Sequence, residues 1–246
     1  MLRKYSKWLA LIIIPAWVGL SFFAAQAIVL GIFWALLTLN VPLSSLNETL
    51  LNAVSVALIY AITISLVILV PWLVRKKKVN LVDIGLDRLP LWTDILLAPA
   101  GLVVYLIASS FLIMLATNFL PGFDANQIQE VGFSHLSNQY EFIVAFIILV
   151  VFIPVSEEIL FRGYLFGKLK KISPIWLAIL LTSLLFGVLH GAWNVAIDTI
   201  ALSVVLCVLR QISGSIWPSI LLHMTKNAIA FYFLFINTSF LTTLGR

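Results

Sequence analysis

The chain consists of long apolar blocks separated by short polar segments. A bilayer core about 30 Å thick requires roughly 20 apolar residues in a helix that rises about 1.5 Å per residue, and several blocks reach that length. The pattern therefore predicts about seven membrane-spanning helices. We expect them near residues 9–38, 49–74, 92–117, 141–168, 173–190, 194–211 and 215–237.

The composition supports the same class of protein. Of the 246 residues, 62% are hydrophobic and 10% are charged, whereas about a quarter of a soluble domain is charged. The first apolar run, from Trp8 to Leu39, is longer than the apolar region of a signal peptide and has no clear cleavage site. We therefore expect it to be a retained membrane anchor. The predicted fold class is an all-α, polytopic transmembrane helix bundle.

Basic residues gather beside the apolar blocks and predict the topology. They lie at the N-terminus, in residues 75–78, in residues 168–171 and at Arg210. Seven spans place all four clusters on one side, which the positive-inside rule makes cytoplasmic. We expect a cytoplasmic N-terminus, an external loop at 118–140 and a prokaryotic cytoplasmic membrane. The net charge of +5 then requires no nucleic-acid partner.

The main polar break divides the chain into two parts. Residues 1–90 are expected to hold the N-terminal helices and a basic cytoplasmic loop. Residues 91–246 are expected to hold the rest of the membrane region, with a functional core of four helices at about 140–236. The lipid bilayer is a necessary partner of both parts.

Several ionisable or polar residues lie inside the last four spans. A charge in hydrocarbon costs several kcal/mol and is usually retained for a function. The residues occur in three groups along the chain: Glu157, Glu158 and Arg162; His190, preceded by Phe186; and His223 with Asn227.

Helical geometry makes a shared site possible. Glu158 and Arg162 are four residues apart and can neutralise one another on one helix face, and His223 and Asn227 are spaced in the same way. At the rise of an α-helix, Glu157 lies about 21 Å and His190 roughly 26–28 Å from the basic boundary at 168–171. His223 lies about 17 Å from the boundary near residue 212. Pro154, just before the glutamates, frees a backbone carbonyl that needs a polar partner in lipid.

The three groups, taken in order, resemble the motif series of the CAAX protease and bacteriocin-processing family, also called CPBP or Abi. The matching patterns are Glu-Glu-x-x-x-Arg at 157–162, Phe-x-x-x-His at 186–190 and His-x-x-x-Asn at 223–227. The run Gly-Ser-Ile-Trp-Pro-Ser-Ile at 214–220 also resembles the segment before the last motif. The resemblance covers about residues 140–236.

The resemblance implies an intramembrane endopeptidase that cleaves a membrane-associated protein or peptide. Glu157 would activate the attacking water with help from His190, while His223 and Asn227 would stabilise the oxyanion. Glu158 and Arg162 would support the site. In a metalloprotease version, Zn²⁺ would be bound by Glu157, His190, His223 and Asn227. The spacing of the residues does not choose between these versions.

One alternative class is a non-catalytic membrane scaffold or a partner-binding protein of the bacteriocin-immunity type. Such a protein would tolerate loss of Glu157 or His190. Asp198 belongs to none of the three motifs. We favour a position at the outer interface for it, and the other interpretation is pairing with a site residue or with Lys226.

Overall fold

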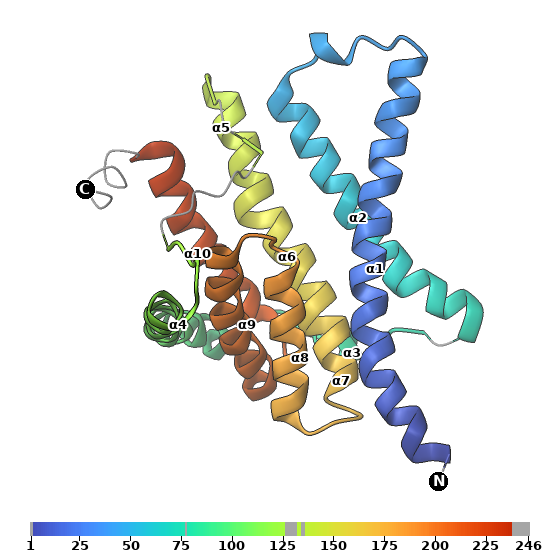
Figure 1. Cartoon of the computed structure of the whole chain (residues 1–246), viewed down its shortest axis with the longest axis vertical. Helices are drawn as coiled ribbons and strands as arrows, with labels where there is room; N and C mark the ends of the chain where they lie inside the picture. Colours follow the sequence, from blue (N-terminus) through green and yellow to red (C-terminus); the bar gives the residue numbers. More distant parts are fainter. Residues whose placement is uncertain (1, 77, 126–131, 134–135, 238–246) are drawn as a thin grey trace.

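The computed structural model describes residues 2–76, 78–125, 132–133 and 136–237 of the chain. Helices dominate these ranges (Figure 1). The α-helices are α1 (Leu2–Thr38), α2 (Glu48–Arg75), α3 (Leu81–Ile84), α4 (Trp92–Phe119), α5 (Gln139–Phe146), α6 (Ile153–Glu158), α7 (Phe166–Leu169), α8 (Ile175–Val188), α9 (Trp193–Ser213) and α10 (Trp217–Phe231). The other helical turns are η1 (Leu43–Ser45), η2 (Ile147–Phe152), η3 (Ile159–Leu165) and η4 (Tyr232–Ile236).

The prediction of a polytopic helical membrane protein is confirmed. Within the described residues, 6 helices are long and apolar enough to cross a membrane. The predicted fifth span corresponds to α8, which has 14 residues and is about 21 Å long, shorter than the usual bilayer core. Lys77 of the basic loop and residues 126–131 and 134–135 of the predicted external loop lie outside the described residues.

One long helix, Gln139–Leu169, carries the glutamate motif and contains two changes of helical register. The turns η2 and η3 are π-helical, and the short α6 with its two glutamates lies between them. π-helical turns are rare and frequently occur at functional sites. The glutamate motif therefore lies on a segment whose backbone departs from a regular α-helix.

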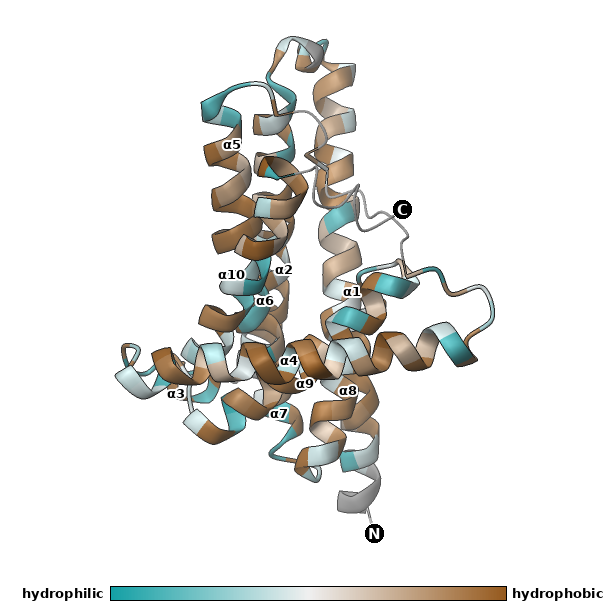
Figure 2. Cartoon of the chain, turned by 90° about the vertical axis from the view of Figure 1, so that its left-hand side faces the viewer, coloured by the Kyte–Doolittle hydropathy of each residue, from teal (hydrophilic) through white to brown (hydrophobic). Residues whose placement is uncertain are grey.

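Helix α4 lies crosswise to α1 and α2 and covers α9 and α10. It is seen end-on in Figure 1 and across the molecule in Figure 2. Close packing is possible because Gly101 has no side chain: a Cβ there would lie 2.6 Å from Leu222 and 2.9 Å from Leu209. Small residues allow helix backbones to approach in this way inside membranes.

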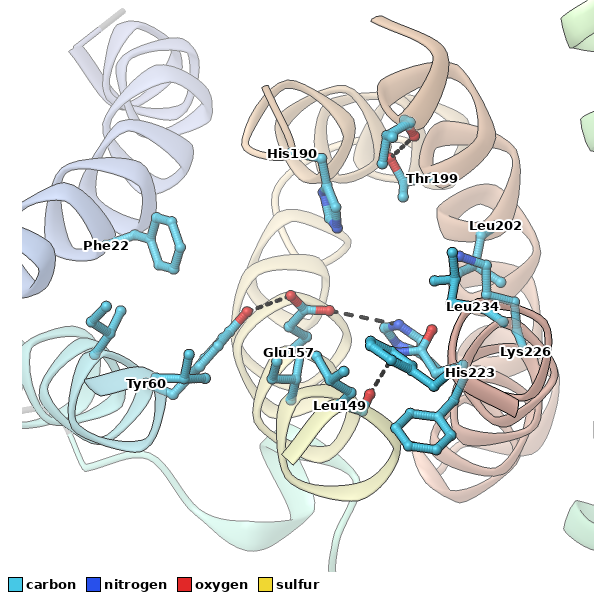
Figure 3. A pocket seen from close by; sticks show the side chains of 18 residues that line it. Phe22, Tyr60, Leu149, Glu157, His190, Thr199, Leu202, His223, Lys226 and Leu234 are labelled. Carbon is cyan, nitrogen blue, oxygen red and sulfur yellow. Dashed lines mark hydrogen bonds and ion pairs between the residues drawn. The ribbon is translucent and has the colours of Figure 1, made fainter. Parts of the chain in front are cut away.

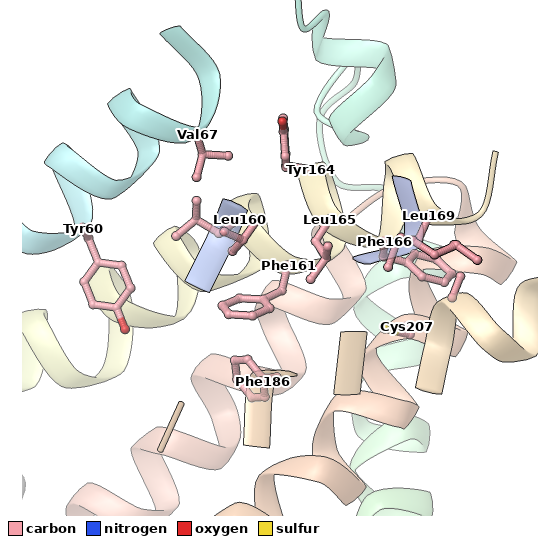
Figure 4. Packing of buried hydrophobic residues seen from close by; sticks show 13 residues of the cluster. Tyr60, Val67, Leu160, Phe161, Tyr164, Leu165, Phe166, Leu169, Phe186 and Cys207 are labelled. Atoms are coloured by element: carbon pink, nitrogen blue, oxygen red, sulfur yellow. The ribbon is translucent and has the colours of Figure 1, made fainter. Parts of the chain in front are cut away.

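Helices α8 and α9 also meet across a glycine. A Cβ on Gly187 would lie 2.4 Å from Ile200 Cγ1 and 2.8 Å from the carbonyl oxygen of Ala196. The neighbouring Phe186 joins the buried cluster of Figure 4 and packs edge-on against Phe161, with 4.9 Å between ring centroids. The α8–α9 contact thus fixes the end of α8, from which His190 follows.

The Gly187→Ala variant tests this contact. The added methyl group would collide with a backbone oxygen, so we expect destabilisation by about 1–3 kcal/mol, as is typical of overpacked cores. Thermal unfolding of the detergent-purified protein measures it. The matched control is Gly31→Ala in α1, where a Cβ meets nothing within 4 Å. Equal stability of the two variants would contradict close packing of α8 on α9.

Candidate active site

A cavity of about 480 Å³ lies between α1, α2, α6, α9 and α10 (Figure 3). Most of its lining is apolar, as in other small-molecule and peptide sites, where a few polar groups fix orientation. The four residues predicted to be catalytic all line it: Glu157, His190, His223 and Asn227. Helices far apart in the sequence thus bring the three motifs together.

Glu157 is buried, and its two oxygens face different neighbours. Oε1 accepts a hydrogen bond of 2.5 Å from the hydroxyl of Tyr60 on α2. Oε2 lies 3.6 Å from Nε2 of His223 on α10. Figure 3 shows Tyr60 and His223 on opposite sides of the carboxylate. Oε2, which lies too far from the imidazole for a hydrogen bond, is the oxygen available to a reacting group.

Glu158 has a different environment, although it is the next residue. Successive helical residues point about 100° apart, so the side chain of Glu158 turns away from the cavity. It has no solvent exposure, and its Oε1 accepts from Arg162 Nη1 at 2.8 Å and from His223 Nδ1 at 2.9 Å. The expected Glu158–Arg162 pair is therefore present, and the same carboxylate also orients an imidazole.

The hydrogen bond to Glu158 determines which face of His223 reaches the cavity. A carboxylate accepts, so Nδ1 of His223 carries a proton, and in the neutral ring Nε2 is then the basic nitrogen. A carboxylate that fixes the tautomer of an adjacent imidazole is a common arrangement in enzymes. Nε2, directed toward Glu157, can accept a proton or bind a cation.

His190 is oriented by a backbone group. Its Nδ1 lies 2.7 Å from the carbonyl oxygen of Phe186, one helical turn earlier. A carbonyl only accepts, so Nδ1 is the donor and the neutral ring keeps its lone pair on Nε2. The imidazole also packs edge-on against the Phe186 ring at 4.8 Å. In Figure 3, the ring extends toward the space beside Glu157.

Asn227 stabilises the irregular backbone near the glutamates. Its Nδ2 donates to the carbonyl oxygen of Leu149 at 2.9 Å. In the π register of η2, in which the N–H of Ile153 bonds to the carbonyl of Ile148, the partner of Leu149 would be residue 154. That residue is Pro154, which has no N–H. The carboxamide therefore replaces the bond that proline cannot make.

The residues fit a metal only in part. Both imidazoles can present Nε2 to the cavity, and Glu157 contributes a carboxylate oxygen, so the types of donor suit Zn²⁺. Over the residues that the structure describes, however, no group of three or more His, Cys, Asp or Glu side chains is close enough to hold a metal ion.

Sequence reasoning did not find Tyr60. It lies on α2, outside the motifs, and one tyrosine in an apolar span resembles ordinary packing. Its hydroxyl was the available signal, because a buried tyrosine usually finds a hydrogen-bond partner. Thr199 and Lys226 line the cavity as well, and neither was predicted to belong to the site.

The structure supports the second interpretation of Asp198, pairing with Lys226, and adds two partners on α4. Its Oδ1 accepts from Tyr105 at 2.7 Å and from Ser109 at 2.5 Å, both on α4. Its Oδ2 lies 3.5 Å from Nζ of Lys226. These bonds connect the crosswise α4 to α9 and α10, and Asp198 is not a member of the cavity lining.

Comparison with known proteins identifies the class of this region. Residues 139–229 match the family described as type II CAAX prenyl endopeptidase Rce1-like. The match confirms the resemblance inferred from the three motifs, and at the level of the family it supports a CAAX-type intramembrane protease. It contains every predicted site residue and excludes α1 to α4.

Comparison with curated proteins and with solved structures gives less information than the family match. The chain is 27% identical over 134 residues to the UPF0177 protein YxdF of Lactococcus lactis subsp. lactis (strain IL1403), covering 52% of this chain and 67% of that protein. No solved structure matches.

The Arg162→Met variant tests the buried ion pair. Without the guanidinium, Glu158 becomes an uncompensated buried charge, and we expect a loss of about 3–5 kcal/mol of stability. Adding Glu158→Gln removes that charge and should recover part of the loss. Unfolding of the two single variants and the double variant measures the coupling. Additive effects would contradict a direct interaction between the two side chains.

Proposed function

We propose that the protein is an intramembrane endopeptidase that hydrolyses a peptide bond with a water molecule activated by Glu157. The observation that carries this proposal is the convergence of Glu157, His190, His223 and Asn227 on one cavity. Both imidazoles have their tautomers fixed by acceptors, Glu158 and the Phe186 carbonyl. Such fixed donors and acceptors characterise a catalytic site more than a scaffold.

Glu157 is the proposed general base. One of its oxygens is held by Tyr60, and the other is directed to the cavity near His223. A base has to lie within hydrogen-bond reach of the water that it deprotonates, and Oε2 can meet that requirement. His190, whose ring extends toward the space beside Glu157 in Figure 3, is proposed to orient the same water through Nε2.

The proposed proton transfer moves a negative charge and does not remove it. When Glu157 takes a proton from water, its charge passes to the hydroxide oxygen and then to the oxyanion of the tetrahedral intermediate. The ion pair of Glu158 with Arg162 keeps the second glutamate from adding an uncompensated charge beside the first.

The oxyanion is proposed to be stabilised from α10. After Glu157 has taken the proton, His223 can receive it on Nε2, present that N–H to the tetrahedral intermediate, and pass the proton to the leaving amine when the C–N bond breaks. Asn227 has a second N–H besides the one bonded to Leu149. The Asn227 N–H is a donor before the reaction begins, and such a donor stabilises the developing charge without reorganisation.

The proposed substrate is a membrane-associated protein or peptide. The cavity is lined largely by apolar side chains, including Phe22, Ile59 and Leu202. An apolar lining suits a peptide that reaches the site from the bilayer. The basic clusters lead us to propose a cytoplasmic N-terminus.

The Glu157→Gln variant tests the proposed base. Glutamine keeps the shape of the side chain and can still accept from Tyr60, but it cannot take up a proton. We expect a fall in kcat of at least about 100-fold with normal membrane insertion. The measurement is cleavage of a peptide or reporter substrate by protein reconstituted in liposomes.

Glu141→Gln is the matched control, because Glu141 lies on the same long helix and outside the cavity lining. Its carboxylate accepts from Asn47 at 2.7 Å, and glutamine can still accept there. We expect its kcat to stay near that of the wild type. Cleavage retained by Glu157→Gln would exclude Glu157 as the base and favour a scaffold.

Elemental analysis of the purified protein decides whether Zn²⁺ takes part. The samples are the wild type, Glu157→Ala and His223→Ala. About one zinc ion per chain, lost in both variants, would make Glu157 and His223 metal ligands. Metal content that does not differ among the three samples would leave the carboxylate and imidazoles to activate water alone.

A further inference from the structure

Two helices outside the region of family resemblance reach the site. The cavity is lined by Phe22 of α1 and by Val56, Ile59 and Tyr60 of α2, whereas the match begins at residue 139. A second cavity of about 170 Å³ is also lined by Phe22 and Tyr60 from these helices. Glu157 and His190 line both cavities, so the N-terminal helices adjoin the catalytic groups on two sides.

Tyr60 is held firmly in this position. Its side chain is 8% exposed, and its ring packs against Phe22 and Phe152 with centroid distances of 6.0 Å and 6.4 Å. The hydroxyl donates to Oε1 of Glu157 at 2.5 Å. Because the ring is fixed by packing on two sides, the hydroxyl defines the position of this oxygen.

The hydrogen bond makes the two carboxylate oxygens unequal. Oε1 is held by the phenol, so Oε2 is the oxygen that lies near Nε2 of His223. Rotation of the carboxylate about its last bond would break the bond to Tyr60. A donor that fixes this rotation keeps Oε2 directed at the attacking water, and small errors in such geometry reduce rates strongly.

We propose that Tyr60 is a positioning residue for Glu157, so that α2 completes a catalytic site whose other residues come from the family-like region. This inference rests on the proposed function, since it assigns a role relative to the base. Tyr60 acts through Glu157, and it does not bind the substrate peptide by its hydroxyl. The N-terminal helices are therefore part of the enzyme's active site as well as of its membrane anchor.

The Tyr60→Phe variant tests the proposal, because it removes the hydroxyl and keeps the ring. A hydrogen bond to a charged group is lost, so we expect kcat to fall by roughly 10- to 100-fold. KM should change by less than about threefold, because the apolar lining is unchanged. Reconstituted full-length protein and the peptide substrate used for Glu157→Gln serve for the measurement.

Tyr105→Phe is the matched control. Tyr105 is 5% exposed and donates to the carboxylate of Asp198 at 2.7 Å, so the same atom is removed from a similar environment. It is not part of the cavity lining. We expect both variants to lose similar thermal stability, while only Tyr60→Phe loses kcat. A purely structural role for Tyr60 would give the two variants the same activity.

Three outcomes separate the inference from the proposed function. Inactive Glu157→Gln together with slow Tyr60→Phe supports both. Inactive Glu157→Gln together with a Tyr60→Phe kcat within about threefold of wild type overturns the positioning role alone. Active Glu157→Gln overturns the proposed base, and with it the role assigned to Tyr60.

Tyr60→Leu, which also removes the ring, should raise KM in addition if packing shapes the cavity.

Discussion

The carboxylate of Glu158 imposes the constraint on which the catalytic region depends. It has no solvent exposure, so it has to be neutralised by protein groups within the bundle. Arg162 supplies the positive charge from the same long helix, and His223 supplies a hydrogen bond from α10. The Glu158 side chain therefore needs a neutralising partner and also orients the imidazole of His223. The position of His223 opposite Glu157 follows from the need to satisfy the buried charge.

The backbone around the glutamates obeys the same requirement for satisfied polar groups. In lipid, an unpaired carbonyl is costly, and proline creates one wherever it interrupts a helical ladder. Here, the amide of Asn227 bonds to the Leu149 carbonyl, which lies opposite Pro154 in the π register. The motif residue of α10 therefore stabilises the irregular turn before α6. This contact keeps α10, and with it His223, beside the helix that carries Glu157.

The fold class and the candidate site residues were predicted from two different physical signals in the sequence. Apolar blocks of membrane length identify spans directly, and charges inside them stand out because they are costly. The length of α8 and the crosswise course of α4 were not predictable, because hydropathy does not encode direction. Gly101 shows the reason: the contact that allows α4 to cross α10 depends on one missing side chain.

The contacts between sites far apart in the chain were harder to predict than the motifs. Helical spacing links Glu158 to Arg162, but no spacing links Tyr60 to Glu157, which are 97 residues apart. Asp198 was uncertain for a similar reason, since its partners Tyr105 and Ser109 come from α4. A polar residue in an apolar helix signals that a partner exists, and only the tertiary structure identifies it.

The proposed hydrolysis within a membrane poses a difficulty, and the contribution of α1 and α2 to the cavity would resolve it. Water has to reach Glu157, while the surrounding lipid is apolar and offers no hydrogen bonds. Phe22, Ile59 and Tyr60 form the wall of the cavity on the side of the N-terminal helices. Without that wall, the carboxylate would face hydrocarbon and a charged base would be costly there. The Tyr60 hydroxyl is the polar group of this wall, and it donates a hydrogen bond to the Glu157 carboxylate. In the proposed function, the same helix pair therefore separates Glu157 from lipid and provides the hydrogen bond that orients the proposed base.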